Sequence, residues 1–238
     1  MNLEGKNIFV VGGSSGIGLS LVQRLVQEKA NVYVICRSAA ETWPNSIHYL
    51  QADVTADLEQ LEQFLPAQLH GLVYAVGSIN LKPFNRLSAE DFQNDFQLNV
   101  LGAVRSIQLA LKSLRAADGA SIVLISSVAA NLGMPYHASV AAAKSAVQGL
   151  AISLAAEYAF QKIRVNVIAP SLTDTPMAEK LLSSAEKQEA SAKRHPLGRY
   201  GQPADNSEVI AFLLADESSW ITGQVIGIDG GIGKLKTN

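Results

Sequence analysis

The sequence predicts a doubly wound α/β fold, in which a parallel sheet of about seven strands is covered by helices on both faces. Short apolar runs alternate with helical patterns almost without interruption along the 238 residues, which is the order expected of strand–helix–strand units. Most of these runs are continuously apolar, as in strands that are buried on both faces. No linker or shift in composition divides the chain, so residues 1–238 are expected to form a single domain.

The first strand, expected at 8–12, ends in a glycine turn, and helix 17–29 follows at once. Glycines have no Cβ, so the backbone can turn sharply here and approach a pyrophosphate closely. Free N–H groups and the dipole at the start of the helix favour phosphate oxygens. The turn residues expected to bind a dinucleotide are Gly12, Ser14, Ser15, Gly16, Ile17 and Gly18. Their spacing differs from G-x-G-x-x-G, so an ordinary strand-to-helix turn is the alternative for this segment alone.

The remaining elements follow in alternation. Further strands are expected at 31–36, 47–51, 71–76, 121–126, 164–168 and 225–228, and further helices at 56–65, 88–116, 139–161, 177–193 and 204–215. Only about ten residues, Pro44 among them, separate the second strand from the third. A parallel crossover usually needs a dozen or more residues, so this connection is expected to be irregular or a single helical turn.

Polar residues gather where the predicted strands end. In a doubly wound sheet the ligand lies beyond the carboxyl ends of the strands. The residues at those ends are Ser14, Ser15, Arg37, Asp53, Gly77, Ser126, Ser127 and the loop 170–175. The sequence therefore places the functional site along one edge of the sheet.

Several motifs stand in the order typical of one enzyme family. They are GGSSGIG (12–18), Asp53-Val54, Asn99 within LNVLG, ISS (125–127), Lys144 at the start of an alanine-rich helix, RVNVIAPSLTDT (164–175) and WITGQVIGIDGG (220–231). With these motifs the chain resembles the short-chain dehydrogenase/reductase family over essentially its whole length. The resemblance implies a Rossmann-type fold, a nicotinamide cofactor and a small-molecule substrate.

The resemblance also assigns roles to residues at the strand ends. It implies that Ser127 polarises a carbonyl oxygen, that Lys144 binds the nicotinamide ribose, and that Asn99 supports the site. Besides the glycine-turn residues, the expected cofactor contacts are Arg37, Ser38, Asp53, Val54, Ala75, Gly77, Lys144, Pro170, Leu172 and Thr175. In the family, a tyrosine four residues before the lysine donates or accepts the substrate proton, and the nearby ammonium lowers its pKa.

Val140 stands at the position of that tyrosine, four residues before Lys144 and thirteen after Ser127. Valine carries no proton, and loss of a general acid typically costs about 10²–10⁴-fold in rate. One alternative is that His137 or Tyr136, expected in the loop before the helix, replaces the tyrosine, since histidine titrates in the physiological range. The others are a bound water that delivers the proton, a protein that binds cofactor without redox chemistry, and a different reaction such as elimination.

From these alternatives we expect an oxidoreductase that acts on a carbonyl or alcohol substrate. The catalytic residues expected are Ser127, Lys144, Asn99 and His137. The alternative function is a cofactor-binding regulatory protein or subunit that is catalytically weak or inactive.

The end of the second strand indicates which nicotinamide cofactor the chain prefers. An acidic residue there would bind the ribose 2′-OH and favour NAD, but the position holds Cys36, followed by Arg37 and Ser38. An arginine pairs with a 2′-phosphate, and a serine can donate a hydrogen bond to it. The sequence therefore predicts NADP(H) rather than NAD(H).

Residues 176–200 are expected to form a mobile lid over the substrate, with His195 and Arg199 as surface or hinge residues. Ser171 stands where the family usually has glycine after proline, and its side chain is expected to narrow the nicotinamide site. Trp220 is expected in the core.

Composition excludes several classes of function. A net charge of −2 with no basic stripe argues against nucleic-acid binding. The chain shows no signal-peptide pattern and no apolar run of membrane-spanning length. Cys36 is alone and no Cys/His cluster has metal-site spacing, so no disulfide and no metal are expected. These features predict a soluble cytoplasmic protein, and the resemblance implies a homodimer or homotetramer that pairs through the alanine-rich helix.

Overall fold

The structure, a computed structural model, describes residues 1–56, 58 and 60–236. Over this part, seven strands form one sheet in the order β3-β2-β1-β4-β5-β6-β7. Every neighbouring pair runs parallel. The strands are β1 (Asn7–Val11), β2 (Asn31–Cys36), β3 (His48–Gln51), β4 (Gly71–Tyr74), β5 (Ala120–Ile125), β6 (Ile163–Pro170) and β7 (Val225–Ile228). The strand order reverses between β1 and β4, which is where such sheets bind ligands. The predicted fold class is confirmed.

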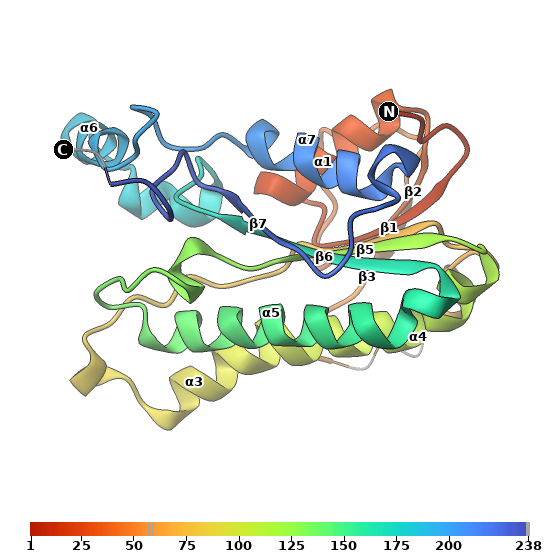
Figure 1. Ribbon diagram of the computed structural model, residues 1–238, viewed down its shortest axis with the longest axis horizontal. Coiled ribbons are helices and arrows are strands. Elements are labelled where there is room, and N and C mark those ends of the chain that lie inside the picture. The colour runs from red at the N-terminus through yellow and green to blue at the C-terminus, as the bar shows by residue number, and fades with distance from the viewer. Residues whose placement is uncertain (57, 59, 237–238) are drawn as a thin grey trace.

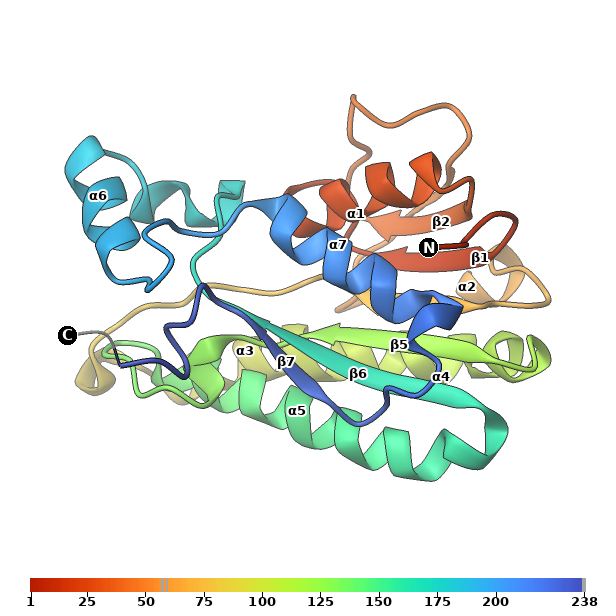
Figure 2. The same ribbon diagram turned by 45° about the horizontal axis from the view of Figure 1, so that its top comes forward.

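Helices cover both faces of the sheet (Figure 1). The α-helices of the described residues are α1 (Gly16–Gln27), α2 (Leu61–Phe64), α3 (Ala89–Phe96), α4 (Gly102–Ala116), α5 (Ala138–Tyr158), α6 (Ala185–Lys193) and α7 (Pro203–Leu214). Helices α1 and α7 lie on one face, and α4 and α5 lie on the other; the turned view shows the same two layers (Figure 2). Helix α6 lies beyond one end of the sheet in both views.

Strand β1 shows why the sequence runs are continuously apolar. Phe9 and Val11 belong to the hydrophobic core under α4 and α5, whereas Ile8 and Val10 belong to the core under α1 and α7. All four side chains are fully buried. Because successive side chains of a strand point to opposite faces, a strand between two helical layers needs apolar residues at every position.

The predicted helix 88–116 is interrupted. Helix α3 ends at Phe96, a π-helical turn, η2, spans Gln97–Leu101, and α4 continues from Gly102. Such a turn holds one extra residue and changes the direction in which the side chains after it point. It therefore decides where Asn99 lies, and the periodicity of the apolar residues did not indicate it.

Two other predicted helices are shorter than expected. The segment 177–193 divides into a 3₁₀ stretch, η5 (Pro176–Leu181), and α6. Of the predicted helix 56–65, the structure contains the single turn α2, while residues 57 and 59 lie outside the described part.

The connection between β2 and β3 is irregular, as predicted. Trp43 lies in it and donates from Nε1 to the carbonyl oxygen of Gly13 at 3.1 Å. Its ring also lies 5.2 Å from that of Tyr49 on β3. The connection is thereby tied to the glycine turn, at the edge where the cofactor is expected.

Among the residues that the structure describes, one segment, Ala138–Gln161, is long and apolar enough to cross a membrane, with a mean hydropathy of 1.3. It contains α5, whose residues Ala143, Val147 and Ala151 are buried in the core against the sheet. The apolar character of this helix is therefore explained by packing inside the protein.

Candidate active site

The glycine turn between β1 and α1 has the backbone geometry that the sequence predicts. Gly12 has φ +89° and Gly16 has φ +52°, conformations that favour glycine. A Cβ added to Gly18 would lie 2.0 Å from the carbonyl oxygen of Gly12, so no other residue fits there. Ser15 precedes α1, and its side chain makes no capping hydrogen bond. The first N–H groups of α1 therefore have no side-chain cap, which suits a phosphate.

The loops after β2 and β3 lie beside the glycine turn, at the carboxyl ends of the strands. Arg37 and Ser38 follow β2 and are exposed. Asp53 follows β3, and its Oδ1 accepts hydrogen bonds from the hydroxyl and the N–H of Thr55 at 2.7 and 2.8 Å. These hydrogen bonds hold the pKa of Asp53 below its ordinary value. Val54, next to it, is buried. The residues expected at the adenosine end of the cofactor thus lie together at this edge.

Two catalytic candidates far apart in the sequence, Lys144 and Asn99, meet at Gly77. Lys144, on α5, donates from Nζ to the carbonyl oxygen of Ile125 at the end of β5, at 2.7 Å. A Cβ added to Gly77 would lie 3.1 Å from Lys144 Nζ and 3.2 Å from Asn99 Oδ1. Ser127 follows β5, and its Oγ accepts from the N–H of Ala129 at 3.2 Å. The structure therefore brings Lys144 and Asn99 to one point, with Ser127 two residues beyond the strand end that binds Lys144.

A buried polar cluster supports Asn99. Its Nδ2 donates to the carbonyl oxygen of Asp95 at 2.8 Å and to Ser78 Oγ at 2.9 Å. The Ser78 hydroxyl in turn donates to Asp95 Oδ1 at 2.6 Å. Asn99 Oδ1 and Asp95 Oδ2 have no hydrogen-bond partner among the residues that the structure describes. Asp95 and Ser78 were not among the predicted site residues. The spacing of four residues between Asp95 and Asn99 did indicate that both lie on the same face of a helix.

Burial changes the acidity of Lys144. The side chain is almost fully enclosed, with 7% of the residue exposed. This burial lowers the pKa of the amine to about 8, and the negative charge of Asp95 opposes the fall. Lys144 is thus close to the boundary between its charged and neutral forms at physiological pH.

No side chain with a proton stands one turn before Lys144. Val140 lies there on α5 and is buried. His137 is the residue immediately before α5, as predicted, and its Nδ1 lies 2.6 Å from the carbonyl oxygen of Pro135. Because a carbonyl only accepts, Nδ1 carries the proton of that hydrogen bond. Tyr136 is 60% exposed and has φ +69°.

The loop after β6 lies against the glycine turn, at the carboxyl edge of the sheet. A Cβ added to Gly16 would lie 3.2 Å from Cβ of Thr175, so the loop touches the glycine turn. The Thr175 hydroxyl donates to the carbonyl oxygen of Thr173 at 3.3 Å and does not cap the following helix. Pro170 is the last residue of β6, and Leu172 lies in the same loop. The turn for the pyrophosphate and the loop for the nicotinamide are therefore neighbours.

Two expectations about side chains were wrong. His195 is 4% exposed: its Nδ1 lies 2.7 Å from the carbonyl oxygen of Ser191, and its Nε2 lies 2.8 Å from Ser171 Oγ. It is thus a buried link between the end of α6 and the loop after β6, because Ser171 supplies a hydroxyl where glycine has none. Trp220 is 99% exposed and does not belong to the core. Arg199 is exposed and paired with Asp205 at 2.6 Å.

Comparison with known proteins decides the family. The family model described as enoyl-(acyl carrier protein) reductase matches residues 11–233. A short-chain type dehydrogenase/reductase from Mycobacterium ulcerans superimposes with a TM-score of 0.89 at 30% identity, over 98% of this chain and 91% of that one. The chain belongs to the short-chain dehydrogenase/reductase family.

Two further relatives narrow the comparison within the short-chain dehydrogenases/reductases. The 3-oxoacyl-(acyl-carrier-protein) reductase FabG of Thermotoga maritima is 36% identical over 247 residues, which cover 98% of this chain and 99% of that protein. A structure titled ElxO with NADP bound is 28% identical, with a TM-score of 0.89, over 97% of this chain and all of that one. The chain is thus an oxidoreductase of the short-chain dehydrogenase/reductase type.

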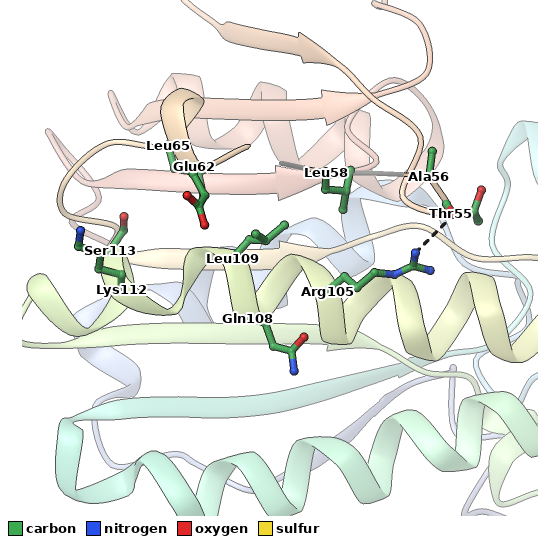
Figure 3. A pocket seen from close by; sticks show the side chains of 10 residues that line it. All are labelled: Thr55, Ala56, Leu58, Glu62, Leu65, Arg105, Gln108, Leu109, Lys112 and Ser113. Carbon is green, nitrogen blue, oxygen red and sulfur yellow. Dashed lines mark hydrogen bonds between the residues drawn. The ribbon is translucent and has the colours of Figure 1, made fainter. Parts of the chain in front are cut away.

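A cavity of about 870 Å³ lies between the α2 segment and α4, and Lys144 is not among the residues that line it (Figure 3). Arg105 is one of its lining residues and donates to the carbonyl oxygen of Thr55 at 3.4 Å. A smaller cavity of about 340 Å³ is bounded by Ser171, His195 and the segment after β7. Among the described residues no group of His, Cys, Asp or Glu side chains is arranged to hold a metal ion.

Proposed function

We propose that the protein is an NADP(H)-dependent oxidoreductase that acts on a carbonyl or alcohol substrate without the usual tyrosine acid. The observation that carries this proposal is the convergence of Lys144 Nζ and Asn99 Oδ1 on Gly77, beside the strand end that leads to Ser127.

The described residues fit a nicotinamide dinucleotide. Gly18 leaves no room for a Cβ, and the uncapped start of α1 supplies N–H groups for a pyrophosphate. Arg37 and Ser38 suit a 2′-phosphate, and the end of β2 holds Cys36 in place of an acidic residue that would repel it. NADP is bound in the ElxO relative, which supports the same choice here. The cofactor supplies or accepts the hydride when it is bound.

The side chains of the chain itself account for the rest of the chemistry. The oxygen of Ser127 accepts a hydrogen bond from Ala129, so its O–H is available to donate to a substrate oxygen. Lys144 places a positive charge beside the position where negative charge develops on that oxygen. Val140 cannot donate, so the proton comes from another group, for which His137, Tyr136, a bound water and Lys144 are the candidates.

The second candidate function is a cofactor-binding regulatory protein or subunit with little or no turnover. The observation that favours it is the buried valine at position 140, which removes the group that normally moves the substrate proton. It predicts tight NADPH binding without turnover on any carbonyl or alcohol.

The test combines cofactor titration with activity. We expect NADPH to quench protein fluorescence at lower concentrations than NADH, and a panel of ketones, including 3-oxoacyl thioesters, to show slow reduction. Val140→Tyr is expected to raise the rate by about 10²–10⁴-fold on the best substrate. Val140→Phe is the matched control, because it adds the ring without the hydroxyl. No turnover by either the wild type or Val140→Tyr would favour the regulatory protein.

We also propose a homodimer or homotetramer in the cytoplasm. Large apolar side chains stand exposed on the outer face of α5 and beyond its end: Ile152 is 53% exposed and Phe160 is 100% exposed. Such a surface is typical of contacts between subunits. Light scattering coupled to size exclusion measures the state directly, and a monomer at micromolar concentration would contradict the proposal.

A further inference from the structure

The buried carboxylate of Asp95 is not explained by packing. Asp95 is on α3, next to the end of that helix, and 3% of it is exposed. Its Oδ1 is bound by the Ser78 hydroxyl at 2.6 Å, and its Oδ2 has no partner among the described residues. A buried carboxylate is expensive unless a positive charge or several donors face it. A nearby cation is therefore expected.

That cation is Lys144. Asp95 is linked to it through two shared neighbours: Asn99 donates to the Asp95 carbonyl and to Ser78, and Asn99 Oδ1 lies with Lys144 Nζ over Gly77. The charge of Asp95 raises the pKa of Lys144 against the larger effect of burial. A carboxylate and an amine, both almost completely enclosed, thus stand at the two ends of one polar cluster.

Other charged and titratable groups near this cluster are engaged elsewhere. Asp91, one turn earlier on α3, pairs with Lys82 at 2.6 Å and caps its own helix. Tyr74 on β4 donates to the carbonyl oxygen of Leu98 at 2.5 Å. His137, before α5, uses Nδ1 on a backbone carbonyl. Asp95 is therefore the charged group of the described residues that acts on the Lys144 amine.

The proton donors that remain can be compared by their hydrogens. With Nδ1–H bound to Pro135, a neutral His137 has no proton on Nε2 and can only accept there. The ammonium of Lys144 has three N–H bonds, and one donates to the Ile125 carbonyl. Of the other two, one would bind the nicotinamide ribose, as the family resemblance implies, and one remains for a substrate oxygen beside Gly77. The charged amine therefore has an N–H beside Gly77 whose proton can be transferred to a substrate oxygen.

We propose that, in the oxidoreductase proposed above, Lys144 Nζ donates the proton to the substrate oxygen, and that Asp95 is the positioning residue that keeps this amine charged. In reduction, the carbonyl carbon receives a hydride from the reduced nicotinamide and the electron pair of the C=O π bond moves to oxygen. One Nζ–H bond breaks as the O–H bond forms. Lys144 is left as a neutral amine and regains a proton from solvent; alcohol oxidation reverses each change.

The first test needs neither cofactor nor substrate. Lysine labelled with ¹³C at Cε reports the titration of Lys144 by NMR, and Lys144→Met identifies its signal. We expect the wild-type amine to titrate near about 8. In Asp95→Asn it is expected to titrate about one pH unit lower, because an opposing charge is removed while the hydrogen bond from Ser78 is kept. Asp118→Asn, at an exposed carboxylate paired with Lys162, is the control and leaves the titration unchanged.

The second test is the pH dependence of ketone reduction. Because the charged amine is the acid, the rate is expected to fall as pH rises through about 8 in the wild type and at lower pH in Asp95→Asn. The same fall stays in His137→Ala. If Asp95→Asn does not fold, Asp95→Ser replaces it, because it also removes the charge, and is expected to shift both titrations in the same direction.

The outcomes separate the two proposals. An unchanged Lys144 titration in Asp95→Asn overturns the role of Asp95, whatever the activity. Loss of the high-pH limb in His137→Ala overturns Lys144 as the donor while leaving the oxidoreductase intact. Absence of turnover in every variant, with the NMR shift present, overturns the proposed function and the proton donation but keeps the charge coupling between Asp95 and Lys144.

Discussion

Replacement of Lys144 by methionine measures what the buried amine costs the fold. Burial lowers the pKa of this amine from 10.5 to about 8. At about 1.4 kcal/mol for each tenfold change in the protonation equilibrium, the charged form is about 3 kcal/mol less stable in the folded protein than in the unfolded chain. Methionine keeps most of the volume and has no charge, so Lys144→Met is free of this penalty.

The sign of the pH dependence follows from the same values. Between pH 8 and 10.5 the unfolded chain binds more protons at Lys144 than the folded protein does, so stability rises with pH. The penalty of about 3 kcal/mol is present in full below pH 8 and disappears as pH approaches 10.5. Lys144→Met also loses the hydrogen bond to Ile125, which lowers its stability by about 1 kcal/mol. This loss is the same at every pH, so it does not change how the stability difference depends on pH.

The assay is urea unfolding of both proteins at several pH values from 7 to 10. We expect the wild type to gain about 2–3 kcal/mol relative to Lys144→Met over this range. Lys162→Met is the control, because it removes an amine that is 65% exposed in place of a buried one. A constant difference for Lys144→Met as well would refute the conclusion that burial sets the state of this amine.

Two further predictions concern the cofactor edge. Gly18→Ala brings a Cβ to 2.0 Å from Gly12 O and is expected to lower stability by about 1–3 kcal/mol or more, with loss of NADPH binding, both read from thermal melts with and without NADPH. Arg37→Ala is expected to weaken NADPH binding about tenfold with little effect on NADH, and fluorescence titration showing equal losses for both would contradict a phosphate contact.

The strand ends were predictable because they follow from local patterns. Apolar runs mark buried strands, and the residues after each run, such as Arg37, Asp53 and Ser127, fall at the carboxyl edge whatever the details of packing. Their positions along this edge are confirmed. Their contacts with cofactor and substrate stay predictions.

The burial of Asp95 and His195 could not be predicted, because it follows from tertiary packing and not from a local pattern. Asp95 is an ordinary helix residue in the sequence, and only the packing of α3 against α5 buries it. His195 is a residue near the end of a polar segment, and its burial depends on Ser171, 24 positions away. The spacing of Asp95 and Asn99 indicates a shared helix face, but burial also depends on partners that are distant in sequence, and the sequence pattern does not show these.

The π-helical turn η2, which carries Asn99, is in contact with strand β4. In a π-helical turn one backbone carbonyl loses its regular partner, and here the carbonyl oxygen of Leu98 accepts from the Tyr74 hydroxyl at 2.5 Å. Gly102 makes this contact possible, because a Cβ there would lie 2.2 Å from the Tyr74 oxygen. Tyr74 thus ties β4 to the turn that carries Asn99. Burial raises the pKa of the Tyr74 hydroxyl far above its ordinary value. Tyr74→Phe would leave the Leu98 carbonyl without a partner and is expected to lower stability by about 1–3 kcal/mol, whereas an unaffected melting temperature would show that the turn holds its shape without it.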